Sequence, residues 1–317
     1  MYRLLFLFVF LAQQLFFAAI PYPDFLAAMQ GAKELLLEEN GPYGTTEENP
    51  DLSARQQNLK FFQRNYLKNL ALTKEGFYRI PRIVHQIWLG SAVPTKYHKW
   101  MQSWMHWNGW EYRLWTDKDV KEFGLYNQKL YDLATNYGER SDILRLEILD
   151  RFGGLYVDTD FQCVNAETFD ELHRSFDLYV GFEPGSHGNI HHVNKICNAL
   201  MAACPAHPLI QRLIVNMEAN WIKHQEESAI QKCGPNYLTY TIFDYELPRQ
   251  EDTFRNMYFP CSFFYPISAP EMYHAKSAQE LLQKLSPETA AIHYWSGSWW
   301  LPESKTKKDF AKLSPYG

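Results

Sequence analysis

The chain has 317 residues and a mass of 37.3 kDa, which is enough for one large domain with appendages and a sizeable buried core. Lysine and arginine number 31 against 36 for aspartate and glutamate, so the formal net charge is −5 and nothing indicates a nucleic-acid partner. Aromatic residues make up 16% of the chain, a content that suits sugar and base stacking but is mostly explained by core packing.

The first 22 residues read as a targeting segment. An apolar run follows Arg3 over residues 4–20, LLFLFVFLAQQLFFAAI. The run is slightly long for a cleaved signal and slightly short for a membrane span. We therefore expect a signal peptide or signal anchor over residues 1–22, so that the protein is membrane-anchored by its N-terminus or secreted, with the rest of the chain on the non-cytoplasmic side. The five cysteines are odd in number and lack CxxC spacing, so they do not settle the compartment.

Residues 24–39 and 53–72 read as two helices, separated by the Gly-, Pro- and Glu-rich stretch GPYGTTEENPD. We interpret residues 23–79 as a helical stem or lid. The main domain then covers residues 80–303, and residues 304–317 form a basic C-terminal tail.

The main domain shows strands alternating with helices, which predicts an α/β fold with a mostly parallel sheet. The strands are expected at residues 82–89, 111–116, 155–161 and 178–182. The helices are expected at residues 117–131, near 194–203 and at 208–222. In a nucleotide-binding sheet the ligand lies at the carboxyl ends of the strands, where His85, Gln86 and Trp88 would be.

The segment from Glu139 to Val164 carries the sharpest signal. It reads as a helix, a turn at Gly153-Gly154 and a strand that delivers Asp158 and Asp160. Because side chains alternate along a strand, both carboxylates would share one face with Tyr156. Two acids that close together repel unless a cation lies between them, and an oxygen-only pair suits Mg²⁺ or Mn²⁺ better than Zn²⁺.

The helix before this strand places Asp142 and Arg145 within about 60° of each other, on the stripe that also carries Leu146 and Leu149. The simplest interpretation is an i,i+3 ion pair worth only tenths of a kcal/mol. The alternative is a ligand clamp close to the two aspartates. Further along, Glu183 follows a strand and could contact a sugar or acceptor, although a solvated loop acid is at least as good an interpretation. The histidines of GSHGNIHHVN fit no zinc pattern and read as a mobile loop.

Four ordered blocks carry a family resemblance: IPRIVHQIWLG at 80–90, RSDILRLEIL followed by FGGLYVDTD, CGPNYLT at 233–239 and HYWSGSW at 293–299. They resemble the sugar transferases containing the DXD motif, glycosyltransferase family 32, and are similar to the catalytic core of the large clostridial glucosylating toxins. The resemblance implies a GT-A type nucleotide-sugar-binding fold, Rossmann-like, with an N-terminal helical extension.

The resemblance also implies a set of site residues. Donor binding would fall to His85, Gln86, Trp88, Asp142, Arg145, Tyr156, Asp158, Ser298 and Trp300, with Trp88 stacking on the base. A wall of the acceptor or donor pocket would be built from Gly234, Pro235 and Thr239. His293 would join Asp158 and Asp160 as a late metal ligand. The chain departs from the toxin pattern at Trp295, where the toxins have an acid, so the metal ligand set stays open there.

These residues predict a metal-dependent glycosyltransferase that moves a sugar from a UDP- or GDP-sugar to a glycan, glycolipid or protein acceptor, with retention of anomeric configuration implied by the resemblance. Asp160 would hold Mn²⁺ or Mg²⁺, and Asp158 would be shared between metal and donor. Arg145 would hold the sugar or diphosphate, and Asp142 would accept hydrogen bonds from sugar hydroxyls.

Rival classes fit less well. A haloacid-dehalogenase-type phosphatase wants Thr or Val where Gln162 stands, and an EF-hand wants Gly and Glu where Cys163 and Phe169 stand. A glycoside hydrolase could use the same carboxylates without metal. A non-catalytic relative would bind a nucleotide-sugar or carbohydrate without turnover.

Overall fold

The computed structural model describes residues 20–37, 40–41, 44–45, 50–72, 76–185, 194–249 and 253–297. The apolar run of the predicted targeting segment, apart from residue 20, lies outside these residues, as do the histidines of the predicted mobile loop, Ser298, Trp300 and the basic tail. Within the described part of the chain, no helix combines the length and apolar character needed to span a bilayer.

The domain is built on a six-stranded sheet with the strand order β4-β3-β5-β8-β7-β9. The strands are β3 (Ile83–Ile87), β4 (Glu111–Trp115), β5 (Gly154–Val157), β7 (Leu178–Phe182), β8 (Ile196–Ala203) and β9 (Asn256–Phe259). Pairing is antiparallel only where β8 meets β5 and β7. The sheet is therefore mixed but mostly parallel, which confirms the predicted α/β class.

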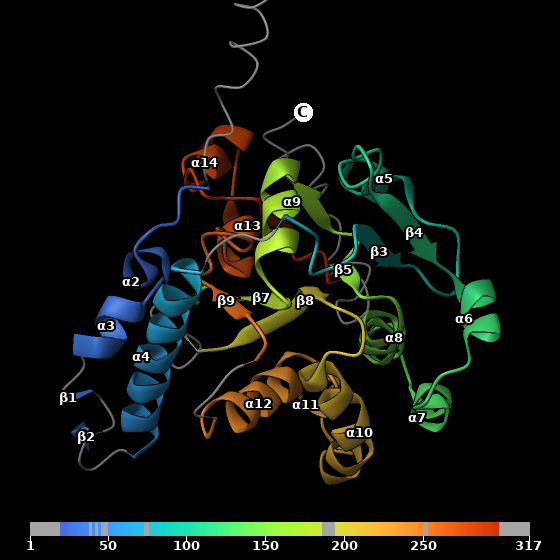
Figure 1. Ribbon diagram of the computed structural model, residues 1–317, viewed down its shortest axis with the longest axis horizontal. Helices are drawn as coiled ribbons and strands as arrows, with labels where there is room; N and C mark the ends of the chain where they lie inside the picture. The colour runs from blue at the N-terminus through green and yellow to red at the C-terminus, as the bar shows by residue number, and fades with distance from the viewer. Residues whose placement is uncertain are drawn as a thin grey trace, which may run out of the picture.

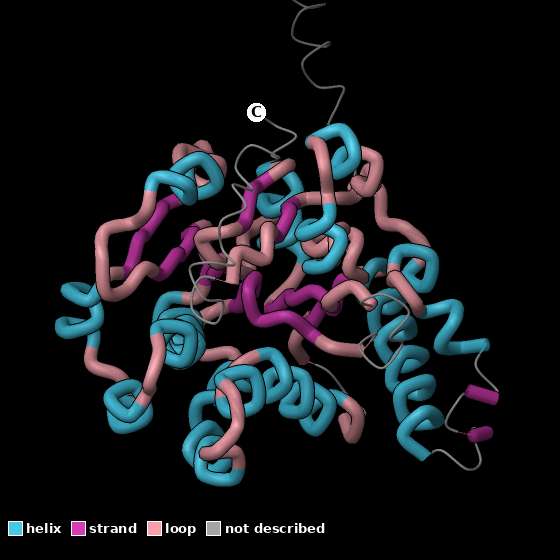
Figure 2. The backbone as a smooth tube through the Cα atoms, turned by 180° about the vertical axis from the view of Figure 1, so that it is seen from behind, coloured by secondary structure: helices cyan, strands magenta, loops and turns pink. Residues whose placement is uncertain are grey.

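Helices cover both faces of this sheet (Figures 1 and 2). On one face lie α8 (Tyr137–Phe152), α10 (Pro208–Lys223), α11 (Ala229–Lys232) and α12 (Pro235–Glu246). On the other lie α9 (Ala166–Ser175), α13 (Ala269–His274) and α14 (Ala278–Leu282). The remaining helices of the main domain, α5 (Thr95–Gln102), α6 (Asp117–Phe123) and α7 (Gln128–Leu133), lie toward the β3–β4 edge.

The turn from α8 into β5 needs its two glycines. Asn136 caps the start of α8 by accepting a hydrogen bond from the Glu139 amide. The helix ends at Gly153, whose φ is +62°, and Gly154 follows with φ +98°. A Cβ at Gly154 would lie 2.6 Å from the Ile83 carbonyl oxygen, so only glycine allows β5 to lie this close to β3.

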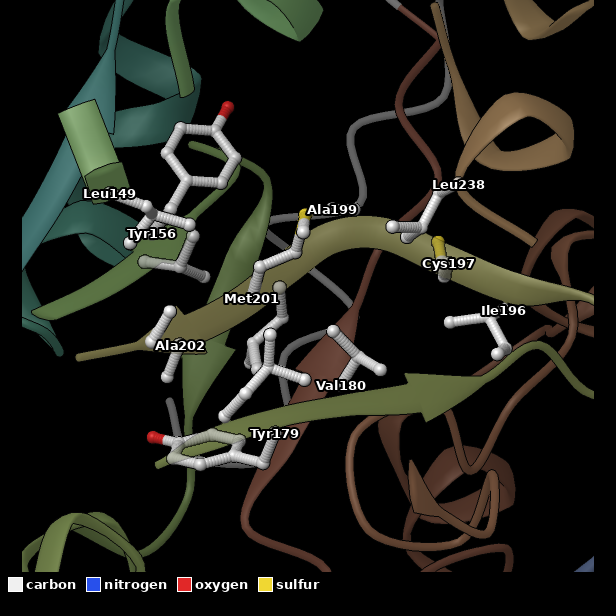
Figure 3. Close-up of a cluster of buried hydrophobic side chains, with 14 of the residues drawn as sticks. Leu149, Tyr156, Tyr179, Val180, Ile196, Cys197, Ala199, Met201, Ala202 and Leu238 are labelled. Carbon is white, nitrogen blue, oxygen red and sulfur yellow. The ribbon is translucent and has the colours of Figure 1, made fainter. Parts of the chain in front are cut away.

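The core lies on both sides of β8, a central strand of the sheet. Figure 3 shows side chains from α8, β5, β7, β8 and α12 meeting there, among them Leu149, Tyr156, Val180, Met201 and Leu238. All eight residues of β8 are buried. A central strand covered on both faces shows no polar and apolar alternation, which is why this strand has no clear sequence signature.

Three predicted elements were wrong in detail. The helix expected near residues 194–203 is strand β8, because burial between β5 and β7 overrides the helical preference of its Ala, Leu and Met residues. The strand expected over residues 155–161 ends at Val157, and a turn separates it from β6 (Phe161–Cys163). The helix expected over residues 117–131 divides at Gly124, whose φ is +67°.

The long N-terminal helix packs directly onto the sheet, with two short helices beside it. These helices are α2 (Phe25–Ala28), α3 (Ala32–Leu37) and the long α4 (Pro50–Leu70). The ring of Phe62 on α4 lies 4.8 Å from that of Tyr258 and 5.3 Å from those of Phe182 and Phe243. Helix α4 of the segment predicted as a stem or lid is therefore part of the packed body of the domain.

Replacing Phe62 by alanine should lower the free energy of unfolding by about 3–5 kcal/mol, because a fully buried ring would be removed from contacts with β7, β9 and α12. Urea unfolding followed by circular dichroism measures the change. Leu67→Ala on the same helix is the control, since Leu67 is 55% exposed and its loss should cost no more than about 0.5 kcal/mol. Equal stability of the two variants would contradict the packing of α4 on the sheet.

Candidate functional site

The two aspartates lie in the turn between β5 and β6, at the carboxyl end of a central strand. Strand β6 pairs with β10 (Ala291–His293), and this antiparallel register sets His293 opposite Phe161. The rings of His293 and Phe161 stack with their centroids 4.5 Å apart. As a result, one ligand atom from each of Asp158, Asp160 and His293 lies within 4.8 Å of the others.

Asp160 is held by the last residue of β10 and by two backbone amides that follow it. Its Oδ1 lies 3.2 Å from Nε2 of His293, its Oδ2 accepts a hydrogen bond from the Ser296 amide at 2.8 Å, and its carbonyl accepts one from the Tyr294 amide. Burial alone would raise the pKa of Asp160, but the His293 ring and the Ser296 amide lower that pKa to about 2. Asp160 is therefore fixed as a carboxylate.

The left-handed backbone of Trp295 makes this arrangement possible. Its φ is +51°, an uncommon conformation for a residue other than glycine. The turn lets the side chain of His293 and the amide of Ser296 reach the two oxygens of the same carboxylate. The indole N–H donates to the Ile267 carbonyl at 2.8 Å, which anchors the strained residue.

Asp158 has different partners from Asp160. Its Oδ1 accepts a hydrogen bond from the Tyr156 hydroxyl at 2.5 Å and lies 3.4 Å from Nη2 of Arg145. Its backbone amide donates to the Ala199 carbonyl on β8. Burial raises the pKa of Asp158, and although Arg145 lowers it, the charge of Asp160 adds to the upward shift. The two neighbouring acids are therefore held with their pKa values displaced in opposite directions.

Arg145 connects the DXD turn to helix α8. It is 4% exposed, and its Nη2 lies 3.0 Å from Oδ1 of Asp142 and 3.4 Å from Asp158. Its Nη1 donates to the Asn198 carbonyl at 2.7 Å, and Nη2 also donates to the Ser141 hydroxyl. The structure therefore shows the predicted i,i+3 pair of Arg145 and Asp142, but as a buried pair that lies beside Asp158. The ligand clamp stays a prediction.

Asp142 lies against the CGPNYLT block. Its Oδ1 accepts a hydrogen bond from the side-chain Nδ2 of Asn198 at 2.8 Å, and its Oδ2 lies 3.7 Å from Sγ of Cys233. A Cβ on Gly234 would lie 3.3 Å from Oδ2, so this glycine allows the loop to pack closely on the carboxylate. Burial raises the pKa of Asp142 to about 7, although Arg145 and Asn198 lower it.

The rest of this block supports the fold around Asp142. Pro235 is the first residue of α12, and Thr239 on the next turn donates its hydroxyl to the Pro235 carbonyl at 2.7 Å. The same hydroxyl accepts a hydrogen bond from the Ile196 amide at the start of β8. Of the predicted pocket wall, the structure therefore brings Gly234 to the site, whereas the Thr239 side chain ties α12 to β8.

The HQIW block contributes in three different ways. His85 is fully buried, and its ring accepts a hydrogen bond from Trp115 at Nδ1 and donates to the Gly153 carbonyl from Nε2. Both ring nitrogens of His85 are therefore used inside the core. Gln86 accepts from the Tyr112 hydroxyl and donates to the Asp158 carbonyl at 3.2 Å, so it supports the DXD turn. Trp88 is partly exposed, and its ring lies 4.9 Å from that of Tyr97.

Glu183 forms an ion pair with Lys195 at 3.2 Å, so its carboxylate is already neutralised by its own neighbour. Ser298 and Trp300, predicted to contact the diphosphate, lie outside the described residues. Sequence reasoning missed Asn198, Ser141 and Ser296. The signal for Asn198 was the single strongly polar residue in the apolar segment ICNALMAA.

Asp158, Asp160 and His293 fit a divalent cation. The donor set is two carboxylates and one imidazole, which suits Mn²⁺ better than Mg²⁺, because Mg²⁺ prefers oxygen ligands throughout. The second ring nitrogen of His293, Nδ1, is buried and has no hydrogen-bond partner within the described part of the chain.

The comparison with protein families agrees with this geometry. Residues 94–175 match the family model described as glycosyltransferase sugar-binding region containing DXD motif. The matched segment runs from α5 to the end of α9 and contains Asp142, Arg145, Asp158 and Asp160. The predicted resemblance to DXD sugar transferases is confirmed for this segment.

Curated relatives are similar over parts of their length. "Subversion of eukaryotic traffic protein A" from Legionella pneumophila is 28% identical over 172 residues, 45% of this chain and 26% of that protein. Inositol phosphoceramide mannosyltransferase 1 from Schizosaccharomyces pombe is 26% identical over 184 residues, 55% of this chain and 54% of the relative. The chain thus spans about a quarter of the first relative and about half of the second.

Two solved structures are also similar. The PaToxG glycosyltransferase is 17% identical, with 84% of this chain and 98% of that chain covered and a TM-score of 0.45. The catalytic domain of alpha-toxin from Clostridium novyi is 12% identical, with 70% and 73% covered and a TM-score of 0.34.

Replacing Arg145 by methionine should lower the free energy of unfolding by about 3–5 kcal/mol, because Asp142 and Asp158 would lose their shared cation in a buried setting. Thermal and urea unfolding measure the change. Lys129→Met is the control: Lys129 pairs with Glu218 on the surface with 75% of its side chain exposed, so its loss should cost at most about 1 kcal/mol. A stable Arg145→Met variant would mean that Arg145 does not hold the two acids together.

Proposed function

We propose that the chain is a metal-dependent glycosyltransferase that moves a hexose from a nucleoside-diphosphate sugar to an acceptor, with retention of anomeric configuration. The observation that carries the proposal is the group formed by Asp158, Asp160 and His293, whose ligand atoms lie within 4.8 Å of one another in the segment matched by the DXD sugar-binding family. Arg145 and Asp142 lie directly beside this group.

Asp158, Asp160 and His293 would hold the cation, and Mn²⁺ is the first candidate because of the imidazole ligand. A bound divalent cation supplies Lewis-acid stabilisation of the negative charge that develops on the departing diphosphate. Asp160 is prepared for this task, because the Ser296 amide and the His293 ring keep it ionised and fix its orientation.

The neighbouring side chains would orient the donor. Arg145 is fixed by contacts with Asp142, Asn198 and Ser141, so its guanidinium needs little reorganisation to meet an anionic or hydroxyl-rich group near Asp158. Asp142 would accept hydrogen bonds from sugar hydroxyls. Trp88, partly exposed at the carboxyl end of β3, remains the candidate to stack on the nucleobase.

Among possible substrates, a mannosyl donor and a glycolipid acceptor have the most support. Three of the curated relatives are named inositol phosphoceramide mannosyltransferase, and the matches to them cover 55%, 44% and 44% of this chain. We therefore propose GDP- and UDP-linked hexoses as donors, with a glycolipid as the first acceptor to test. A glycan or a protein acceptor is an alternative outcome of the same assay.

The rival classes predict different behaviour. A phosphatase of the haloacid-dehalogenase type would release phosphate from simple phosphate esters, and a glycoside hydrolase would turn over without metal. A non-catalytic relative would bind the nucleotide-sugar without releasing nucleotide. The reaction products and the dependence on a metal ion therefore distinguish each rival class from a transferase.

The purified protein should release nucleoside diphosphate from one member of a panel of UDP- and GDP-sugars when Mn²⁺ is present, and EDTA should abolish the release. Asp158→Asn and Asp160→Asn should each lower kcat by about 100-fold or more, because charge stabilisation of the leaving group is lost. Asp132→Asn, on an exposed turn of α7, should leave the rate unchanged.

Circular dichroism of both aspartate variants serves as the control for folding. Retained turnover in folded Asp158→Asn and Asp160→Asn would contradict the proposed role of the DXD pair. Turnover that is unaffected by EDTA would contradict the metal requirement and would favour a glycoside hydrolase.

We propose further that the apolar run at residues 4–20, which lies outside the described residues, targets the protein to a membrane with the enzyme domain on the non-cytoplasmic side. The full chain should then be found in the membrane fraction or secreted, and intact vesicles should protect a C-terminal epitope from added protease. Deleting residues 1–22 should leave the protein in the cytosol. A full chain that stays in the cytosol would overturn this proposal.

A further inference from the structure

Aromatic and cationic side chains gather at the amino ends of β3 and β4. Trp107 and Trp110 lie in the turn before β4, are partly exposed, and meet edge to face with their ring centroids 5.0 Å apart. Phe77, in the segment before β3, is 60% exposed. None of these residues has a part in the proposed sugar transfer. With their neighbours they form what we call the aromatic surface: Phe77, Tyr78, Arg82, Trp107 and Trp110.

Arg82 lies at the centre of the aromatic surface. Its guanidinium lies 4.4 Å from the centroid of the Tyr78 ring, and a Cβ on Gly109 would lie 2.6 Å from its Nη1. Within the part of the chain that the structure describes, this guanidinium forms no ion pair and donates no hydrogen bond. Arg174, which also stacks on Tyr78, is instead paired with Asp170. Arg82 is therefore a fixed cation that can bind an anionic group from outside the domain.

The N-terminal apolar run joins the domain without a linker. The run covers residues 4–20 in the sequence, and Ile20, its last residue, is only 6% exposed within the core. Because one residue spans at most about 3.6 Å, a run held in a bilayer would bring the adjoining part of the domain to the lipid headgroups.

Helix α9 lies between the start of the described chain and the aromatic surface. The Tyr22 ring contacts that of Phe263, and the contacts continue through Phe264 and through Phe169 on α9 to Trp107. The centroids of each successive pair lie no more than 6.1 Å apart. The aromatic surface therefore lies close to the point where the apolar run ends.

The composition of the aromatic surface suits the boundary of a bilayer. Indole rings combine an apolar body with a polar N–H group and gather at the headgroup level of membranes, and an exposed phenylalanine adds apolar area. An arginine among them can bind the phosphate that phospholipid headgroups carry. A soluble glycan or a second copy of the chain could also cover aromatic rings, but neither accounts for the adjoining apolar run.

We infer that the aromatic surface docks on the membrane, with Phe77, Trp107 and Trp110 in the headgroup region and Arg82 bound to a lipid phosphate. The inference rests on the proposed membrane targeting and extends it from residues 1–22 to a second contact made by the domain itself.

This docking would keep the site near the membrane. The Trp104 ring lies 5.4 Å from that of Trp107, and the Trp104 indole donates to the carbonyl of Phe161 at 2.8 Å. Phe161 directly follows Asp160 of the DXD turn. A glycolipid in the same bilayer would therefore meet the domain close to the proposed cation site.

Tryptophan quenching by brominated lipid tests the docking in the full chain. The apolar run contains no tryptophan, so indoles that bromine on the acyl chains of phosphatidylcholine vesicles quenches must belong to the rest of the chain. The double variant Trp107→Phe/Trp110→Phe should lose about half or more of the quenched emission. Arg82→Gln should also reduce the quenching. Trp88→Phe is the matched control: Trp88 is partly exposed too, but it follows the carboxyl end of β3, so the quenched emission should not change.

Vesicle flotation and circular dichroism accompany each measurement, so that membrane association and folding are known for every variant. A folded chain that floats with the vesicles but shows no quenching, or the same quenching in the double variant, overturns the inference and leaves the targeting proposal standing. A full chain that does not float overturns the targeting proposal and this inference with it. A dimer in detergent that the double variant dissociates would assign the aromatic surface to a contact between two copies, which also overturns the inference.

Discussion

The compensation of buried negative charge is the constraint on which the site depends. Asp142, Asp158 and Asp160 lie in one region with their side chains 7%, 29% and 11% exposed. Carboxylates so placed are stable as anions only beside positive charge or several hydrogen-bond donors. Arg145 meets this need for Asp142 and Asp158, and His293 with the Ser296 amide meets it for Asp160. A divalent cation bound between Asp158 and Asp160 would compensate the charge that these two carboxylates place close together.

This constraint explains why distant parts of the chain converge. Helix α8 brings Arg145, the β5–β6 turn brings the two aspartates, and the β6–β10 pairing brings His293 from more than a hundred residues later. Strand β8 lies between them, and its Asn198 and Ala199 carbonyls accept hydrogen bonds from Arg145 and from the Asp158 amide. The mostly parallel sheet therefore serves to hold opposite charges at fixed positions at its carboxyl edge.

Local pattern in the sequence was enough to predict much of this site. The Asp158 and Asp160 pair follows a short apolar strand, and helical periodicity alone set Asp142 and Arg145 on one stripe. What local pattern could not supply was long-range pairing. His293 was predicted only through a family resemblance, and His85 was predicted beside a ligand although its ring is bonded within the core. Strand β8 was predicted as a helix because its residues favour helices and only its burial makes it a strand. The contacts of Asn198 with Asp142 and Arg145 depend on that strand and were hidden with it.

Anomalous diffraction at the manganese edge tests the central claim most directly, on crystals grown with Mn²⁺ and a hydrolysis-resistant sugar nucleotide. The account predicts one strong peak within bonding distance of Asp158, Asp160 and His293, with the sugar against Asp142 and Arg145. A sugar nucleotide bound with no manganese at these three residues, or manganese bound elsewhere in the domain, would contradict it.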